Sequence, residues 1–164
     1  MRPFLCAVLV LACAGGAAPS PAPATTDYRD LEQAVVRQVN AYRVRRHLRS
    51  LVADSSLARI ARDHSREMAE RRVSFGHDGF NDRVKQAERR YDFSEIAENV
   101  ALNDYPRART VTVAVDGWLG SPHHRENIEG NFDRTGVGIA RSGDGTYYYT
   151  QIFIARSRFS EPHP

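Results

Sequence analysis

The sequence predicts an α+β domain, a three-layer α-β-α sandwich in which a small antiparallel sheet lies between helices. Two observations support this prediction. Apolar residues recur at helical spacing through much of the chain, and two β-branched and aromatic segments close it. A hairpin turn signal, Ser142–Gly145, lies between those two segments. No internal repeat is found, and 164 residues suit one compact domain.

Apolar periodicity and capping residues predict helices in order along the chain. In the first helix, Leu31, Val35 and Val39 lie on one face. Asp54 is the expected N-cap of the second helix, and Asn81 or Asp82 that of the third. Three of the expected helices cover residues 29–48, 81–90 and 110–118. The second helix in chain order begins at Asp54, and one of its faces carries Leu57, Ile60, Ala61, His64 and Met68.

Three strands complete the predicted domain. Residues 135–141 alternate Val137 and Ile139 with small residues, and residues 147–155 are aromatic and β-branched. A third, short strand is expected over residues 96–102, where Glu98 and Asn99 interrupt an apolar run.

The first 18 residues resemble an export signal, because Arg2 precedes an apolar run too short to span a bilayer and small residues follow it. Val10–Cys13 resembles a bacterial lipobox, which would make Cys13 the lipid-bearing N-terminus. The alternative is ordinary cleavage after a later alanine. We expect a Pro/Ala-rich tether over 19–28, the domain over 29–156 and an unstructured tail over 157–164.

The charge and the cysteine content of the chain limit the classes of function that it can have. The formal net charge is +3 and almost all basic residues are arginines. Arginine clusters would favour nucleic acid, but acidic residues are interspersed, no nucleic-acid motif accompanies the arginines, and the leader indicates export. We therefore expect no nucleic-acid partner. Because Cys6 lies in the leader and Cys13 is removed or lipidated, the mature domain is expected to contain no disulfide.

The segment Trp118–Ile128 is rich in residue types that form functional sites: two histidines, an arginine, a glutamate and an asparagine. Ser121 is the predicted N-cap and Pro122 the first helical residue. His124 then lies in the first turn, near the positive end of the helix dipole, which favours the neutral imidazole. A neutral imidazole can ligate a metal or accept a proton.

Two upstream segments complete a pattern. Residues 75–80 place His77 in a loop between glycines and aromatic residues, and residues 96–101 contain Glu98 and Asn99. In order, these segments resemble the CAP superfamily (cysteine-rich secretory, antigen 5 and pathogenesis-related 1 proteins) in its bacterial extracytoplasmic form. The resemblance runs from about Leu31 to Ala155. Its motifs here are Glu98-Asn99-Val100-Ala101, Trp118, Ser121-Pro122, His124-Arg125, Asn127-Ile128, Gly136-Val137-Gly138 and Tyr149-Thr150-Gln151-Ile152-Phe153.

The resemblance implies the same sandwich fold, with a central cleft lined by two histidines and two acidic residues. Carried over by position, the histidines are His77 and His124, which in many members bind a divalent metal, commonly zinc, and one acid is Glu98. The second acid is missing from its usual place, and Asp78 and Asp82 are the nearest replacements. Three further cleft residues, expected as scaffolding that satisfies backbone groups, are Asn99, Ser121 and Asn127.

The other candidates have structural interpretations. We expect Trp118 to lie in the core and Arg125 to pair with a carboxylate. His64 is expected to face its neighbours from a helix, and His123 is a weak third ligand candidate. His47 and His163 are expected at the surface.

The sequence therefore supports two functions. The first is a non-catalytic binding domain that is secreted, periplasmic or lipid-anchored. It would bind a divalent metal, or a small-molecule, lipid or cell-envelope ligand, and would touch the membrane only through a lipid anchor. The second is a metal-assisted hydrolase of peptides or cell-wall material, with Glu98 as general base. The absence of a convincing nucleophile favours binding, and we expect a monomer.

Overall fold

The computed structural model describes residues 27–157. The predicted export signal with Cys13, most of the predicted tether, and His163 with nearly all of the predicted tail lie outside the described residues.

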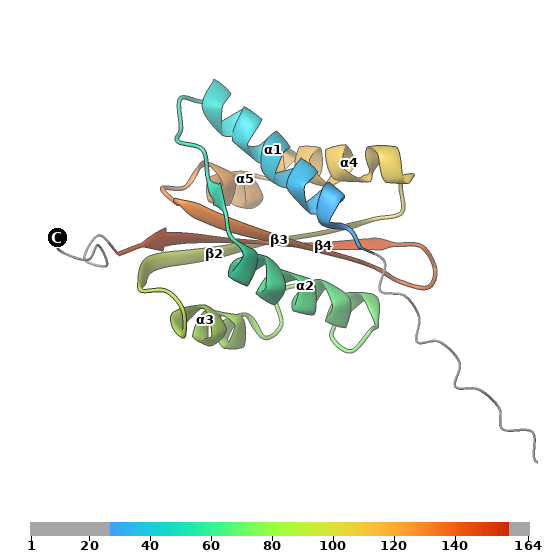
Figure 1. The fold of residues 1–164 in the computed structure, drawn as a ribbon. Coiled ribbons are helices and arrows are strands. Elements are labelled where there is room, and N and C mark those ends of the chain that lie inside the picture. The colour runs from blue at the N-terminus through green and yellow to red at the C-terminus, as the bar shows by residue number, and fades with distance from the viewer. Residues whose placement is uncertain (1–26, 158–164) are drawn as a thin grey trace, which may run out of the picture.

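The predicted three-layer sandwich is confirmed (Figure 1). A four-stranded sheet in the order β1-β3-β4-β2 forms the middle layer. Helices α1, α4 and α5 cover one face, and α2 and α3 cover the other. The elements are α1 (Arg29–Arg45), β1 (Val52–Ala53), α2 (Ser55–Ala69), α3 (Phe80–Glu88), β2 (Phe93–Asn103), α4 (Arg107–Gly120), α5 (Pro122–Glu129), β3 (Arg134–Arg141) and β4 (Tyr147–Arg156).

The sheet differs from the prediction in one respect. It is mixed rather than purely antiparallel, because β1 pairs in parallel with β3 through Val52 and Ala53. A strand of two exposed residues shows no alternation, so periodicity could not predict it. The helix predicted over 110–118 is longer in the structure, where it is α4, and the strand predicted over 96–102 is longer as β2. The first helix ends at Arg45 rather than Leu48.

Two glycines of β3 allow α2 to lie directly on the sheet. A Cβ atom at Gly136 would lie 2.2 Å from the backbone nitrogen of Ala58, and one at Gly138 would lie 2.0 Å from that of Arg62. Only residues without a side chain tolerate such close contact between a helix and a strand. The Gly-Val-Gly motif is therefore a packing requirement of the fold.

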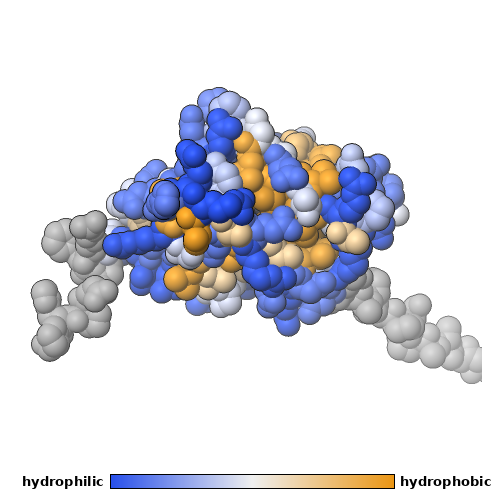
Figure 2. All heavy atoms as spheres, turned by 90° about the horizontal axis from the view of Figure 1, so that it is seen from above, coloured by the Kyte–Doolittle hydropathy of each residue, from blue (hydrophilic) through white to orange (hydrophobic). Residues whose placement is uncertain are grey.

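The face that carries α1 and α4 has apolar residues toward its middle and hydrophilic residues around them (Figure 2). Within residues 27–157, none of the helices combines the length and apolar character needed to cross a membrane.

Candidate functional site

A buried ion pair between Arg83 and Glu98 lies at the centre of the candidate site. Glu98 belongs to β2, and Arg83 comes from α3. The Nε atom of Arg83 lies 2.6 Å from Oε2 of Glu98, and its Nη2 atom lies 2.7 Å from Oε1. The Glu98 side chain is only 2% exposed. This bidentate geometry is the strongest form of arginine–carboxylate pairing.

The same guanidinium also holds the loop before α3. Its Nη1 atom donates to the carbonyl of Asp78 at 2.8 Å, and Nη2 donates to the carbonyl of His77 at 3.3 Å. Nη1 also lies 3.2 Å from Nδ1 of His64. Arginine has five N–H donors and no acceptor, so His64 accepts through Nδ1. Arg83 thereby connects the His77 loop, α2 and β2.

His77 is oriented by Glu98. Its Nδ1 atom lies 2.9 Å from Oε1 of Glu98. Because a carboxylate paired with arginine accepts hydrogen bonds, Nδ1 is the donor to Glu98, and in the neutral ring Nε2 has the lone pair. The His77 side chain is 52% exposed and is therefore accessible to a ligand. Histidine ligands of metals are commonly oriented by a carboxylate in this way.

His124 lies in the first turn of α5, as predicted, with Ser121 at the N-cap position and Pro122 as the first helical residue. The Ser121 side chain makes no cap hydrogen bond. The pKa of His124 is lowered from its ordinary value by burial and by the nearby His77 and His123. His124 is therefore neutral at neutral pH, and His77 is close enough to affect its pKa electrostatically. We call His77, Arg83, Glu98 and His124 the histidine site.

Two asparagines connect α5 to β2 and donate to backbone carbonyls there. The Asn99 amide donates to the carbonyl of His124 at 3.0 Å. The Asn127 amide donates to the carbonyl of Glu98 at 3.2 Å and to Oδ1 of Asn99 at 2.8 Å. Trp118 is buried in the core, as expected, and donates to a carbonyl of β2. These bonds fix the position of His124 relative to Glu98.

Several candidates do not join the site. Asp78 and Asp82 are both exposed, and Asp82 pairs with Lys85 at 3.3 Å. His123 is 95% exposed and lies near Glu126. Across residues 27–157, no group of three or more histidine, cysteine, aspartate or glutamate side chains has an arrangement that could hold a metal ion.

Two further structural expectations can be compared with the structure. Arg125 donates to the carbonyl of Leu119 at 3.0 Å rather than to a carboxylate, so that expectation is wrong. The helix α5 turns back toward the end of α4, and the carbonyl there needs a donor. His47 is exposed, as expected.

Arg83 is the site residue that sequence reasoning missed. It occupies the inner face of α3, four positions before the buried Ala87. A usable signal was present, because an arginine at an apolar position of a short amphipathic helix needs a buried acidic partner. Glu98, in an apolar strand, has the matching need.

His64 is expected to make the domain less stable in acid. Burial lowers the pKa of His64 below its ordinary 6.5, and the nearby Arg83 acts in the same direction. Above pH 6.5 the imidazole is neutral in both the folded and the unfolded chain. Below it, the unfolded chain binds the proton first, so the free energy of unfolding falls with pH until the lowered folded pKa is reached.

The measurement is urea unfolding between about pH 7.5 and about pH 5.5. We expect a His64→Gln variant to be less stable at neutral pH but to lose less stability on acidification. A His123→Gln variant is the matched control, because His123 is exposed, and it should retain the wild-type slope. An unchanged slope in His64→Gln would contradict the prediction.

The fold and the histidine site together define an α-β-α sandwich domain with two histidines beside its sheet. The chain belongs to the CAP family, the cysteine-rich secretory protein family, whose pattern matches residues 36–153. It is 33% identical over 132 residues to the uncharacterized membrane protein YlbC of Bacillus subtilis, and 30% identical over 131 residues to the uncharacterized protein YkwD of the same organism. The matches cover 76% of this chain but only 34% and 47% of those proteins.

Solved structures agree with the assignment. An extracellular protein containing a SCP domain from Bacillus anthracis is 30% identical, with a TM-score of 0.63 over 78% of this chain and 41% of that chain. An outer surface protein of Borrelia burgdorferi has a TM-score of 0.68 at 21% identity, over 80% of this chain and 97% of that one. The second likeness shows the fold alone.

Proposed function

We propose that this CAP domain is a non-catalytic binding domain that works outside the cytoplasm, secreted or attached to the cell envelope. Its histidine site would bind a divalent transition metal. The same site would bind a small or envelope-derived ligand, whether or not the metal is present. The observation that carries the proposal is the state of Glu98. Both of its oxygens are occupied, one by Arg83 and the other by Arg83 and His77. A carboxylate held in this way orients its neighbours and is poorly placed to accept a proton from water.

The donor set fits a metal held by two imidazoles. Nε2 of His77 has a free lone pair by the argument from Glu98, and His124 is neutral. Imidazole nitrogens suit zinc and neighbouring transition metals. Since Glu98 is committed to Arg83, it would orient His77 rather than ligate the metal. Two protein ligands leave the remaining positions to water or to a bound ligand, so we expect weak binding that a ligand strengthens.

One observation favours the alternative, a metal-assisted hydrolase. The His77–Glu98 pair has a histidine whose free nitrogen faces solvent, and such pairs act as general bases in several enzyme classes. A bound metal would polarise a carbonyl or lower the pKa of water. The charge of Glu98 is already compensated by Arg83, which weakens its effect on His77, and for this reason we favour binding.

The test is calorimetric titration of the purified chain with zinc. We expect binding by the wild type and at least roughly tenfold weaker binding by a His77→Ala/His124→Ala double variant, because both protein ligands are removed. A His47→Ala/His123→Ala double variant is the matched control. It removes two exposed histidines and should bind zinc as the wild type does.

Circular dichroism shows whether the variants are folded. The comparison requires that both double variants retain the wild-type spectrum. Equal zinc binding by all three proteins would contradict the assignment of the metal to His77 and His124. Zinc-dependent hydrolysis of a peptide or cell-wall fragment that disappears in the His77→Ala/His124→Ala variant would replace the binding function with the hydrolase.

A further inference from the structure

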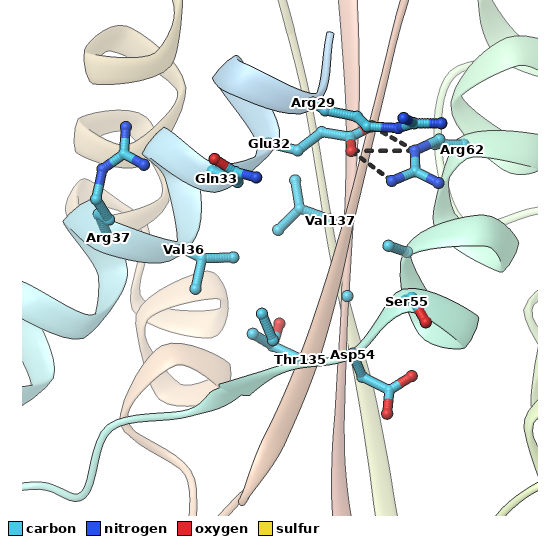
Figure 3. A pocket seen from close by; sticks show the side chains of 13 residues that line it. Arg29, Glu32, Gln33, Val36, Arg37, Asp54, Ser55, Arg62, Thr135 and Val137 are labelled. Atoms are coloured by element: carbon cyan, nitrogen blue, oxygen red, sulfur yellow. Dashed lines mark hydrogen bonds and ion pairs between the residues drawn. The ribbon is translucent and has the colours of Figure 1, made fainter. Parts of the chain in front are cut away.

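A second site lies at the other side of the sheet. A pocket of about 430 Å³ opens between α1 and α2, above the edge of β3 (Figure 3). The strand order β1-β3-β4-β2 places this edge away from β2, which carries Glu98. The pocket is therefore separate from the histidine site. Its walls include Val36 and Arg37 of α1 and Ala58 and Arg62 of α2, and Thr135 and Val137 form its floor.

The pocket exists because β1 is short. β1 pairs with β3 only at Arg134 and Thr135. The chain then turns into α2, where Asp54 donates its N–H to the carbonyl of Thr135 at 2.8 Å. Beyond this point, the edge of β3 has no neighbouring strand within residues 27–157. A length of sheet edge is thereby left at the bottom of a pocket.

Val137 presents its backbone to this pocket. Along a strand, successive residues direct their N–H and C=O groups to opposite edges. The carbonyl of Thr135 faces β1, and the N–H of Ile139 reaches the carboxylate of Glu32 at 3.3 Å. Val137 lies between them and so directs both groups to the same open edge. No backbone or side-chain partner for these two groups is found within the described part of the chain. Burial without a partner is costly for a peptide group, so a ligand that supplies one is favoured.

The charges around the pocket favour an anionic ligand. Arg62 is bound to Glu32 through a bidentate ion pair, with Nε and Nη2 at 2.8 and 2.7 Å, which closes one end (Figure 3). Arg29 and Arg37 also line the pocket. The Arg37 side chain is exposed and, within residues 27–157, makes no hydrogen bond or ion pair. The guanidinium of Arg29 lies 3.6 Å from the exposed carboxylate of Asp27, to which the Arg29 backbone N–H also donates.

The remaining carboxylate of the pocket is already compensated. Asp54 accepts from the backbone N–H groups of Ser56 and Leu57 as the N-cap of α2, and Oδ2 accepts from Arg134 at 3.0 Å. The pocket therefore has an apolar wall, an unpaired backbone floor and a surplus of positive charge on its α1 side.

We propose that this pocket binds an extended peptide segment with an acidic side chain, by strand addition to the edge of β3. In antiparallel register, the residue opposite Val137 exchanges two backbone hydrogen bonds with it. The side chain of that residue points to the same face of the sheet as Val137, toward α1. Arg29 and Arg37, both residues of α1, line the same pocket, so their positive charges would attract a glutamate or aspartate at this position. From Thr135 to Ile139 the edge is roughly 13 Å long, room for about three residues.

The test is an NMR titration of the isotope-labelled purified chain with the probe acetyl-Val-Glu-Val-amide. We expect the Val137 amide signal to shift in the direction of a new hydrogen bond, together with signals of α1 and α2 around the pocket. The signals of His77 and His124 should not shift, so peptide binding at this pocket can be judged independently of metal binding at the histidine site. Acetyl-Val-Lys-Val-amide, and a probe whose glutamate nitrogen is methylated, should both bind at least roughly fivefold more weakly.

Charge-reversal variants give a second, protein-side readout. Arg37→Glu should weaken the glutamate probe roughly fivefold, and Arg90→Glu, an equally exposed arginine away from the pocket, should leave its binding unchanged. The proposal is overturned if the Val137 amide does not respond, or if the lysine probe binds as well as the glutamate probe. Binding of dodecanoate without binding of either peptide would also overturn it, because the pocket would then take an acyl chain.

Discussion

Replacing Arg83 by methionine is expected to lower the free energy of unfolding by about 3–5 kcal/mol, the cost of breaking a buried ion pair from one side. Arg83 is 5% exposed and makes both close contacts with the carboxylate of Glu98. Without it, Glu98 keeps only His77 as a partner, the carbonyl of Asp78 loses the donor from Arg83, and the carbonyl of His77 keeps only the N–H of Phe80. Urea unfolding followed by circular dichroism measures the loss.

A double variant separates the charge from the packing. In Arg83→Met/Glu98→Leu the uncompensated charge is gone, and apolar replacements of buried ion pairs are often close to neutral in stability. We expect the double variant to recover most of the stability lost by Arg83→Met. Arg90→Met, at an exposed position, should differ little from the wild type. If Arg83→Met were as stable as Arg90→Met, the Arg83–Glu98 ion pair would not stabilise the site.

A Gly138→Ala substitution is expected to destabilise the domain by about 3 kcal/mol or more, because it overpacks the contact between α2 and β3. The added Cβ would lie 2.0 Å from the backbone nitrogen of Arg62 and 2.2 Å from the carbonyl carbon of Ala61. Both are backbone atoms, so no side-chain rotation relieves the contact and the whole helix must move. The thermal midpoint and the urea midpoint should both fall.

Gly117→Ala is the matched control for the same chemical change. Gly117 lies within α4 and a Cβ there meets nothing within 4 Å. Alanine favours a helix interior over glycine by up to about 1 kcal/mol, so this variant should be slightly more stable than the wild type. If Gly138→Ala were as well tolerated as Gly117→Ala, α2 would not lie on β3 as described.

Much of the fold could be predicted because its signals are local. The N-cap at Asp54, the Ser121–Pro122 helix start and the strands on either side of the Ser142–Gly145 turn each depend on a few adjacent residues. The two-residue strand β1 could not be predicted, since parallel pairing with β3 is decided by the tertiary fold. Helix ends differ by a few residues because fraying and caps, rather than periodicity, fix them.

The site was predictable in part. His77, Glu98 and His124 were assigned from ordered motifs, and the structure brings Glu98 into contact with His77. The expectation of a second acid led to Asp78 and Asp82. Asp82 lies beside Arg83 in α3, and Asp78 lies in the loop before that helix. The residue that reaches Glu98 is a cation, Arg83, and a pattern of acids and histidines gives no reason to look for one.

The contact between α2 and β3 has a consequence for how the domain folds. Ser65 donates to the carbonyl of Gly138 across 73 positions of sequence, and Arg43 reaches the carbonyl of Ile128 across 85. The first two helices therefore bury their apolar faces against strands that come last in the chain. Such long-range closure slows folding, and it cannot occur before β3 and β4 have been synthesised. A chain that ended before Arg134 would leave α1 and α2 without the sheet that both helices cover.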